Sequence, residues 1–246
     1  MIEETIDILT EDGQMETFVS RPERNGPHTA IFLLMDAPGI REELRDMARR
    51  LAATGYYVLM PNLYYRSGRN TVFGPDVLTE GSQDHTAMRS IRTKMTIPPV
   101  MKDIAAMLKF TENNDEVKKG HVGCHGYCMS GPYALAAAAR YPDRISAAAS
   151  FYGTWIVSDA EESPHLNFQK VKGELYISCA EHDDLAPPEM VKELKVLFNS
   201  SGVKGELEVH PDVHHGFAFP LRWCYDKVAA ERHWERLFSL YKRMEN

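Results

Sequence analysis

The chain has few cysteines, no long apolar run and no excess of positive charge, and each shortage excludes a class of protein. Its four cysteines are too few for a disulfide scaffold, and none form a C-x-x-C pair, which excludes zinc-ribbon and thioredoxin-like motifs. The longest wholly apolar runs, residues 30–35 and 133–139, fall far below the ~20 residues that span a bilayer. The first residues lack a basic region followed by an apolar core, so no signal peptide is expected.

Acidic residues outnumber basic ones, 35 against 28, which gives a net charge of −7. A protein of this charge is a poor candidate for binding nucleic acid through phosphate contacts. Hydrophobic residues make up 43% of the 246 positions, enough for a sizeable core. We therefore expect a single domain over residues 1–246 in a soluble, cytoplasmic protein with free thiols and no membrane partner. No heptad pattern is visible, so the sequence leaves the oligomeric state open.

Strand-like and helix-like segments alternate along the chain. A hairpin is expected around residues 11–14, with strands over 5–9 and 17–20. Further buried strands are expected over residues 29–35, 56–60, 120–124, 145–151, 174–179 and 206–210. Helical spacing is seen over residues 40–51, 100–108, 131–140, 188–198 and from about 226. Residues 61 to about 96 lack periodicity and are expected to be functional or partly helical.

This alternation predicts an α/β fold with a mostly parallel sheet and helices on both faces. In such sheets ligands bind beyond the carboxyl ends of the strands, so the residues after each strand are the candidates for chemistry. Cys128 follows one strand in the run Gly126-Tyr127-Cys128-Met129-Ser130. A nucleophile elbow needs small residues two positions on either side of the nucleophile, and Gly126 and Ser130 meet that need. The competing interpretation is a buried structural cysteine, which we assume for Cys124.

Two more polar loops follow strands. Asp183 lies after the strand that ends near residue 179, where a carboxylate could orient a histidine or simply cap the next helix. His214 and His215 follow the last strand, where a histidine is well placed for general base work. Metal binding by His210 and this histidine pair is a minor alternative, because no matching cysteines or acids stand at ligand spacing. The order nucleophile, acid, base is that of α/β-hydrolases, with cysteine in place of serine.

At these residues the sequence resembles the dienelactone hydrolase family of α/β-hydrolases. The resemblance extends over nearly the whole chain and rests on a G-Y-C-x-S-G elbow at 126–131, a D-x-x-x-P segment at 183–187, H-G-F at 215–217, G-Y at 55–56, P-N-L-Y at 61–64 and Y-G at 152–153. It implies an α/β-hydrolase fold without a large cap domain and a catalytic triad of Cys128, Asp183 and His215. It also implies hydrolysis of a small ester or lactone through an acyl-thioester, with no cofactor and no metal.

The resemblance further implies an oxyanion hole and a substrate pocket. The oxyanion would be held by the backbone N–H groups of Met129 and Ala37, because Pro38 has none. Asp36 stands where the family commonly has a glutamate that contacts the cysteine. Phe219 stands where the founding enzymes have a substrate-binding arginine, four residues after the histidine. The remaining substrate-binding candidates are a cation from the irregular segment, Arg89 or Arg92, and the aromatic residue Tyr152.

Other functions remain open at this stage. The same triad could carry out acyl transfer or thioester hydrolysis. A non-catalytic protein of this fold would bind a small ligand or a partner without turnover. A metal-dependent hydrolase would use the histidines and lose activity on chelation.

Overall fold

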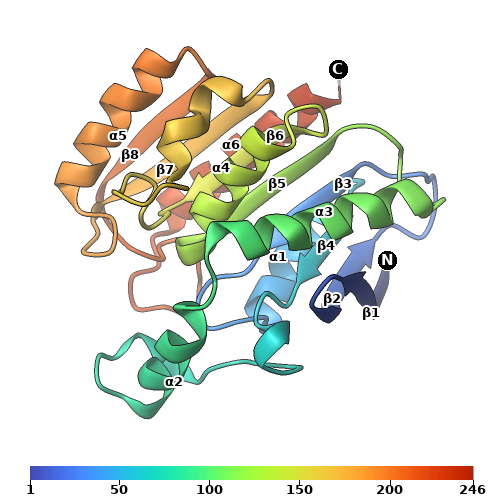
Figure 1. The fold of residues 1–246 in the computed structure, drawn as a ribbon, viewed down its shortest axis with the longest axis horizontal. Helices are drawn as coiled ribbons and strands as arrows, with labels where there is room; N and C mark the ends of the chain where they lie inside the picture. The colour runs from blue at the N-terminus through green and yellow to red at the C-terminus, as the bar shows by residue number, and fades with distance from the viewer. Residues whose placement is uncertain (246) are drawn as a thin grey trace. The chain divides into compact units, whose positions relative to one another are not determined.

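The computed structural model describes residues 1–245, which form two compact units, residues 1–120 and 121–245. Each unit carries four of the strands and its own helices, coloured along the chain in Figure 1. Within these residues no helix is both long and apolar enough to cross a membrane. Because the units are distinct clusters of contacts, the single domain over residues 1–246 stays a prediction.

In the first unit the strands lie in the order β1, β2, β4, β3. The hairpin pair β1–β2 and the pair β2–β4 are antiparallel, whereas β3 and β4 are parallel. Every residue of β3 and β4 is buried, as their continuous apolar sequences predict. The elements are β1 (Ile2–Thr10), β2 (Gly13–Arg21), β3 (Ala30–Leu34), α1 (Glu42–Ala52), β4 (Tyr57–Pro61), the 3-10 turns η1 (Tyr65–Ser67) and η2 (Pro75–Leu78), α2 (Gln83–Arg92) and α3 (Ile97–Asn113).

The segment 61–96 is partly helical, containing η1, η2 and α2. The hydroxyl of Ser82 caps α2 by accepting a hydrogen bond from the backbone N–H of His85. Arg66 in η1 donates two hydrogen bonds of 2.7 and 2.8 Å to Asp103 of α3, whose side chain is fully buried. This ion pair between an exposed arginine and a buried carboxylate anchors the start of the segment to α3.

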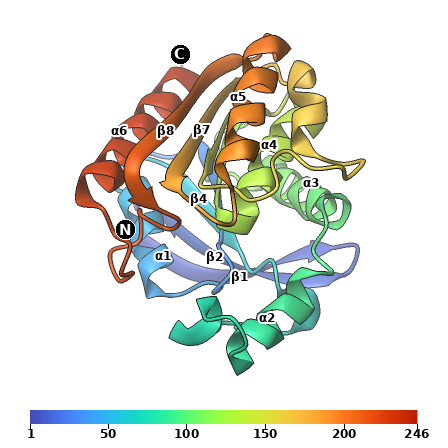
Figure 2. The same ribbon diagram turned by 90° about the vertical axis from the view of Figure 1, so that its left-hand side faces the viewer.

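In the second unit β5, β6, β7 and β8 are neighbours in that order and all pairs are parallel. Helices α4 and α5 lie on one face of these strands and α6 on the other (Figure 2). The fold class, a mostly parallel α/β architecture with helices on both faces, is therefore confirmed. The elements are β5 (Val122–Tyr127), η3 (Cys128–Ser130), α4 (Gly131–Arg140), β6 (Ile145–Phe151), η4 (Pro164–Lys170), β7 (Glu174–His182), α5 (Pro188–Ser201), β8 (Lys204–His214) and α6 (Lys227–Met244).

The last strand is longer than the expected residues 206–210. Pairing of β7 with β8 continues past an irregularity, so that His182 lies opposite His214. The turn residue Pro211 and the polar residues around it hide this extension in the sequence. The consequence is that the strands carry the chain up to the residues just before Asp183 and His215.

Candidate active site

Cys128 lies at a sharp turn between β5 and α4. Its backbone has φ of +54°, a conformation that is strained for a residue with a side chain. A Cβ on Gly126 would clash with the carbonyl of Ser130, and one on Gly131 would clash with the Ser150 hydroxyl. Glycines at these two positions therefore let the strand and the following helix approach closely. The side chain of Cys128 is 5% exposed, at the N-terminal end of α4.

The strand before Cys128 is held by buried polar contacts with α6. The hydroxyl of Tyr127 lies 2.8 Å from Nε2 of His233, and Nδ1 of His233 lies 3.0 Å from the carbonyl of Ala230. A carbonyl only accepts hydrogen bonds, so Nδ1 of His233 donates to Ala230, and the second ring nitrogen shares a hydrogen bond with the Tyr127 hydroxyl. Two residues before Tyr127 on the same strand, Nδ1 of His125 lies 2.7 Å from the hydroxyl of Tyr241. Burial lowers the pKa of His125 to about 3. These contacts hold the end of β5 against α6.

Asp183 follows β7 and is 4% exposed. Its Oδ1 accepts hydrogen bonds from the backbone N–H groups of Leu185 and Ala186, at 2.9 and 3.0 Å. Its Oδ2 accepts a hydrogen bond of 2.7 Å from Nδ1 of His215. Oδ1 is therefore held by the backbone of the loop, whereas Oδ2 orients the imidazole of His215.

His215 follows β8, and its ring is held from several sides. Burial disfavours the charged ring, but the negative charge of Cys128 and the hydrogen bond that the ring donates to Asp183 outweigh it and raise the pKa of His215 to about 10. The second ring nitrogen, Nε2, is buried. Cys128 acts on the ring both through its charge and through a hydrogen bond, so the sulfur lies within reach of the imidazole.

Aromatic rings pack around His215. Tyr152, with φ of +40°, places its ring edge-on to the imidazole at 5.0 Å between centroids. Phe217 and Phe219 pack against Tyr152, and the guanidinium of Arg222 lies 4.5 Å above the ring of Phe219. Tyr152 and Phe219 are both fully buried. The structure therefore brings Tyr152 next to His215, one of the predicted triad residues, and packs Phe219 against Tyr152 and Tyr127.

The remaining predicted residues have different surroundings. In the first unit Asp36 is fully buried and accepts hydrogen bonds of 2.6 and 3.3 Å from Arg41. Ala37 is also buried, and its carbonyl accepts a hydrogen bond from Tyr64. Arg89 is exposed on α2. In the second unit Met129 is buried in η3, directly after Cys128.

The histidines considered for a metal do not form a set in the described structure. His210 is buried and its Nε2 lies 3.0 Å from the Ser178 hydroxyl, and burial lowers the pKa of His210. The ring of His214 packs against those of His182 and Trp223 in tilted geometry, with centroids 5.0 Å from each. Neither ring takes part in the contact between His215 and Asp183.

Sequence reasoning missed two groups of supporting residues. It did not predict Arg41 as the partner of Asp36, although the acidic loop followed by Arg41 and Glu43 offers a weak charge signal. It also did not predict His233, which lies 106 residues from Tyr127 along the chain and reads as one more position on the buried face of α6. The backbone N–H of Thr154, which donates to the Cys128 carbonyl at 3.2 Å, leaves no signal in the side-chain sequence.

Comparison with known sequences gives a consistent result. The pattern of the dienelactone hydrolase family matches residues 15–245. A candidate carboxymethylenebutenolidase of Synechocystis is 24% identical over 248 residues, covering 97% of this chain and 98% of the relative. A second protein of that name, from Escherichia coli K12, is also 24% identical and covers 96% of this chain and 85% of its own length.

Solved structures show the same fold. A candidate dienelactone hydrolase from Klebsiella pneumoniae superimposes with a TM-score of 0.86 at 22% identity, over 98% of both chains. A dienelactone hydrolase-like promiscuous phosphotriesterase from metagenomic libraries gives a TM-score of 0.77 at 20% identity, again over 98% of both chains. The likeness extends over nearly the whole length, as does the match to the family pattern. The chain belongs to the dienelactone hydrolase family, within the α/β-hydrolase superfamily.

Proposed function

We propose that the protein is a cysteine-dependent hydrolase of carboxylic esters or lactones. The observation that carries the proposal is the arrangement around His215, whose Nδ1 contacts Asp183 at 2.7 Å while the charge of Cys128 raises the ring's pKa to about 10. Such a ring stays protonated at neutral pH and favours the thiolate form of the cysteine. A thiolate is the nucleophilic form of this side chain, so the arrangement suits covalent catalysis.

In the first half-reaction the Cys128 thiolate attacks the carbonyl carbon of the substrate. The oxyanion that forms is held by the backbone N–H of Met129, with the N–H of Ala37 as the predicted second donor. Collapse of the intermediate breaks the bond to the alcohol oxygen, and the His215 imidazolium gives its proton to that oxygen. The products are an alcohol, or the opened end of a lactone, and an acyl-thioester on Cys128.

In the second half-reaction neutral His215 takes a proton from water, and the resulting hydroxide attacks the thioester carbonyl. The carbon–sulfur bond breaks, which releases the carboxylic acid and restores the thiolate beside the imidazolium. Asp183 keeps the proton on Nδ1 throughout, so that Nε2 is the nitrogen that exchanges protons. Every proton is therefore accounted for by His215, water and the leaving group.

The names of the relatives give a lactone, opened by carboxymethylenebutenolidases, as the first substrate to test. Phe219 occupies the position expected for a substrate-binding arginine and is buried in an aromatic wall. Asp36 is engaged by Arg41. We therefore propose that short uncharged esters and lactones are hydrolysed at least as well as a carboxylate-bearing dienelactone.

The proposal is tested by measuring hydrolysis of p-nitrophenyl esters and of a dienelactone by the wild type, Cys128→Ala and Cys124→Ala. Cys124 is a matched control, because it lies on β5, the strand that ends just before Cys128, is fully buried, and burial raises the pKa of its thiol. We expect Cys128→Ala to be inactive and Cys124→Ala to keep its rate. Full activity in Cys128→Ala would exclude Cys128 as the nucleophile.

Three further measurements separate the alternatives. Iodoacetamide should alkylate Cys128 before Cys124 and abolish activity together with labelling. Product analysis with an added alcohol or thiol acceptor distinguishes hydrolysis from acyl transfer. A chelator should leave the rate unchanged, whereas a metal-dependent hydrolase would lose it, and a folded protein without turnover on the ester panel would be a binding protein.

A further inference from the structure

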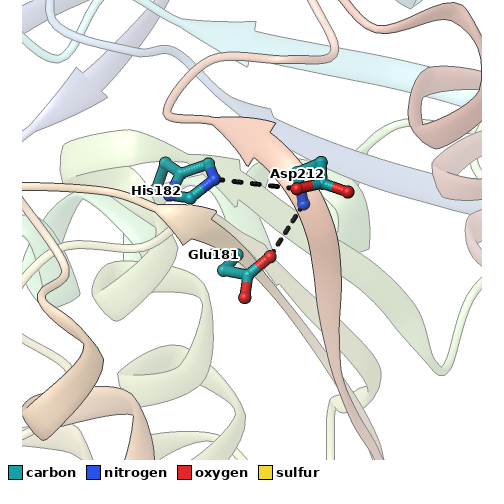
Figure 3. Close-up of side chains that lie close together, drawn as sticks. All are labelled: Glu181, His182 and Asp212. Atoms are coloured by element: carbon teal, nitrogen blue, oxygen red, sulfur yellow. Dashed lines mark hydrogen bonds and ion pairs between the residues drawn. The ribbon is translucent and has the colours of Figure 1, made fainter.

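Three metal-ligating side chains converge on the surface of the second unit, outside the triad. Glu181 and His182 come from the end of β7, and Asp212 comes from β8 (Figure 3). One ligand atom from each residue lies within 4.8 Å of the other two. All three residues are exposed, and Asp212 most of all, with a side chain that is 97% exposed. An ion can therefore reach the cluster directly from solvent.

The irregular pairing of β7 and β8 brings the three side chains together. Ala180 lies opposite His210 and His182 lies opposite His214, so β8 has three residues where β7 has one. Two of the cluster's residues thus face each other across the bulge, and the backbone N–H of Asp212 donates a hydrogen bond of 2.8 Å to Glu181. This contact uses one carboxylate oxygen of Glu181 and leaves the other available.

The spacing within the cluster suits ligands of one ion better than it suits a direct bond. Nε2 of His182 lies 4.0 Å from Oδ1 of Asp212, which is too long for a hydrogen bond. Two ligands on bonds of about 2.0–2.2 Å, as zinc makes to nitrogen and oxygen, lie roughly 3–4 Å apart. Small side-chain rotations would therefore bring the donors onto one ion.

The charge of the cluster also points to a cation. Among residues 1–245 no lysine or arginine forms an ion pair with Glu181 or Asp212, so two carboxylates lie close together with only the imidazole of His182 beside them. Glu174, at the other end of β7, is by contrast paired with Lys204 and Arg243. A dication would remove the repulsion between the two carboxylates.

We propose that Glu181, His182 and Asp212 form a binding site for a divalent transition-metal ion of the zinc class. The imidazole nitrogen favours Zn²⁺, Co²⁺ or Ni²⁺ over Mg²⁺ and Ca²⁺, which prefer oxygen ligands alone. Water completes the coordination, because the site faces solvent. The ring of His182 packs against the ring of His214, tilted by 35° at 5.0 Å between centroids.

The site is distinct from the catalytic residues but adjoins them in the chain. His182 directly precedes Asp183, and Asp212 lies three residues before His215. An ion at this position would tie the end of β7 to the bulge of β8, just before the two loops that hold the acid and the base. Metal binding requires neither Asp183 nor His215, so it does not depend on the proposed hydrolase activity.

The test uses the full chain after removal of metal with a chelator. Zn²⁺ is titrated by calorimetry, and Co²⁺ binding is followed by its visible absorption, for the wild type, His182→Ala and Asp212→Asn. The control is His121→Ala, an exposed histidine in the same unit. We expect one ion per chain, with affinity reduced at least about ten-fold in the two cluster variants and unchanged in the control.

Two outcomes would overturn the proposal. One is the absence of saturable Zn²⁺ binding by the wild type. The other is equal affinity in the wild type, His182→Ala and Asp212→Asn, which would place any bound ion elsewhere on the chain. Because all three variants leave Cys128, Asp183 and His215 intact, loss of ester hydrolysis is neither required nor expected for the result.

Discussion

Replacing Asp183 by asparagine removes one charge from the proposed triad and hardly changes its shape. The carboxylate is 4% exposed, and its Oδ1 is already fixed by the N–H groups of Leu185 and Ala186. In Asp183→Asn the amide oxygen must keep these two donors, so the NH₂ group faces Nδ1 of His215. An NH₂ group only donates, which forces the His215 proton onto Nε2, the nitrogen that has to exchange protons with the substrate.

The expected loss can be worked out from the contact between the carboxylate and the imidazole. Two unit charges about 4 Å apart interact by about 4 kcal/mol at an effective dielectric constant near 20. Each ~1.4 kcal/mol corresponds to a tenfold change in rate, so kcat should fall by roughly 10³-fold. KM should change little, because the charge acts on the reacting proton and does not contact the substrate ground state.

The assay is steady-state hydrolysis of a p-nitrophenyl ester, with thermal unfolding as a check that the variant is folded. Asp184→Asn is the matched control, because Asp184 is the exposed neighbour on the same loop. We expect it to keep the wild-type rate. A folded Asp183→Asn variant with kcat within about three-fold of the wild type would refute the reasoning, as would an equal loss in the control.

Three further predictions concern stability and pH. Gly126→Ala would push a methyl group into the Ser130 carbonyl, so the free energy of unfolding should fall by about 1–3 kcal/mol in urea titrations. Tyr127→Phe removes the 2.8 Å hydrogen bond to His233 and should cost about 1–3 kcal/mol by the same measurement; an unchanged midpoint would contradict it. The pKa of His215, raised from 6.5 to about 10, means that the folded protein holds this proton more tightly than the unfolded chain. The contribution of this proton to the free energy of unfolding is complete below pH 6.5 and is lost as the pH rises through about 10. Urea titrations at several pH values should show this loss for the wild type and not for His215→Gln.

Much of the fold could be predicted because it depends on local patterns. The apolar stretches over residues 29–35 and 56–60 predict strands buried on both faces, and the structure has strands at Ala30–Leu34 and Tyr57–Pro61. The ends of the strands were harder to predict. Pairing of β8 continues to His214 through a proline and an aspartate, because hydrogen bonds from β7 outweigh the local preference of these residues for turns.

In the candidate site too, some features have a local sequence pattern and others do not. Cys128 is detectable because the tight turn requires small neighbours, and Gly126 is a visible consequence of that geometry. The partners that support the site are contributed by distant parts of the chain. The contact between Tyr127 and His233 depends on packing of α6 against the strands, and neither residue differs in sequence from an ordinary core position. Contacts of this kind have no fixed spacing, so a single sequence does not reveal them.

The proposed pairing of Cys128 with the His215 imidazole has a consequence for the lifetime of the protein. A cysteine kept as a thiolate at neutral pH is also the form that peroxide oxidises, first to a sulfenic acid and then irreversibly to higher acids. The side chain is only 5% exposed, which limits access by solvent oxidants when no substrate is bound. In the proposed mechanism each acylation covers the sulfur with a thioester, so turnover itself protects the nucleophile. The number of catalytic cycles before inactivation should therefore depend on the redox state of the surroundings as well as on the supply of substrate.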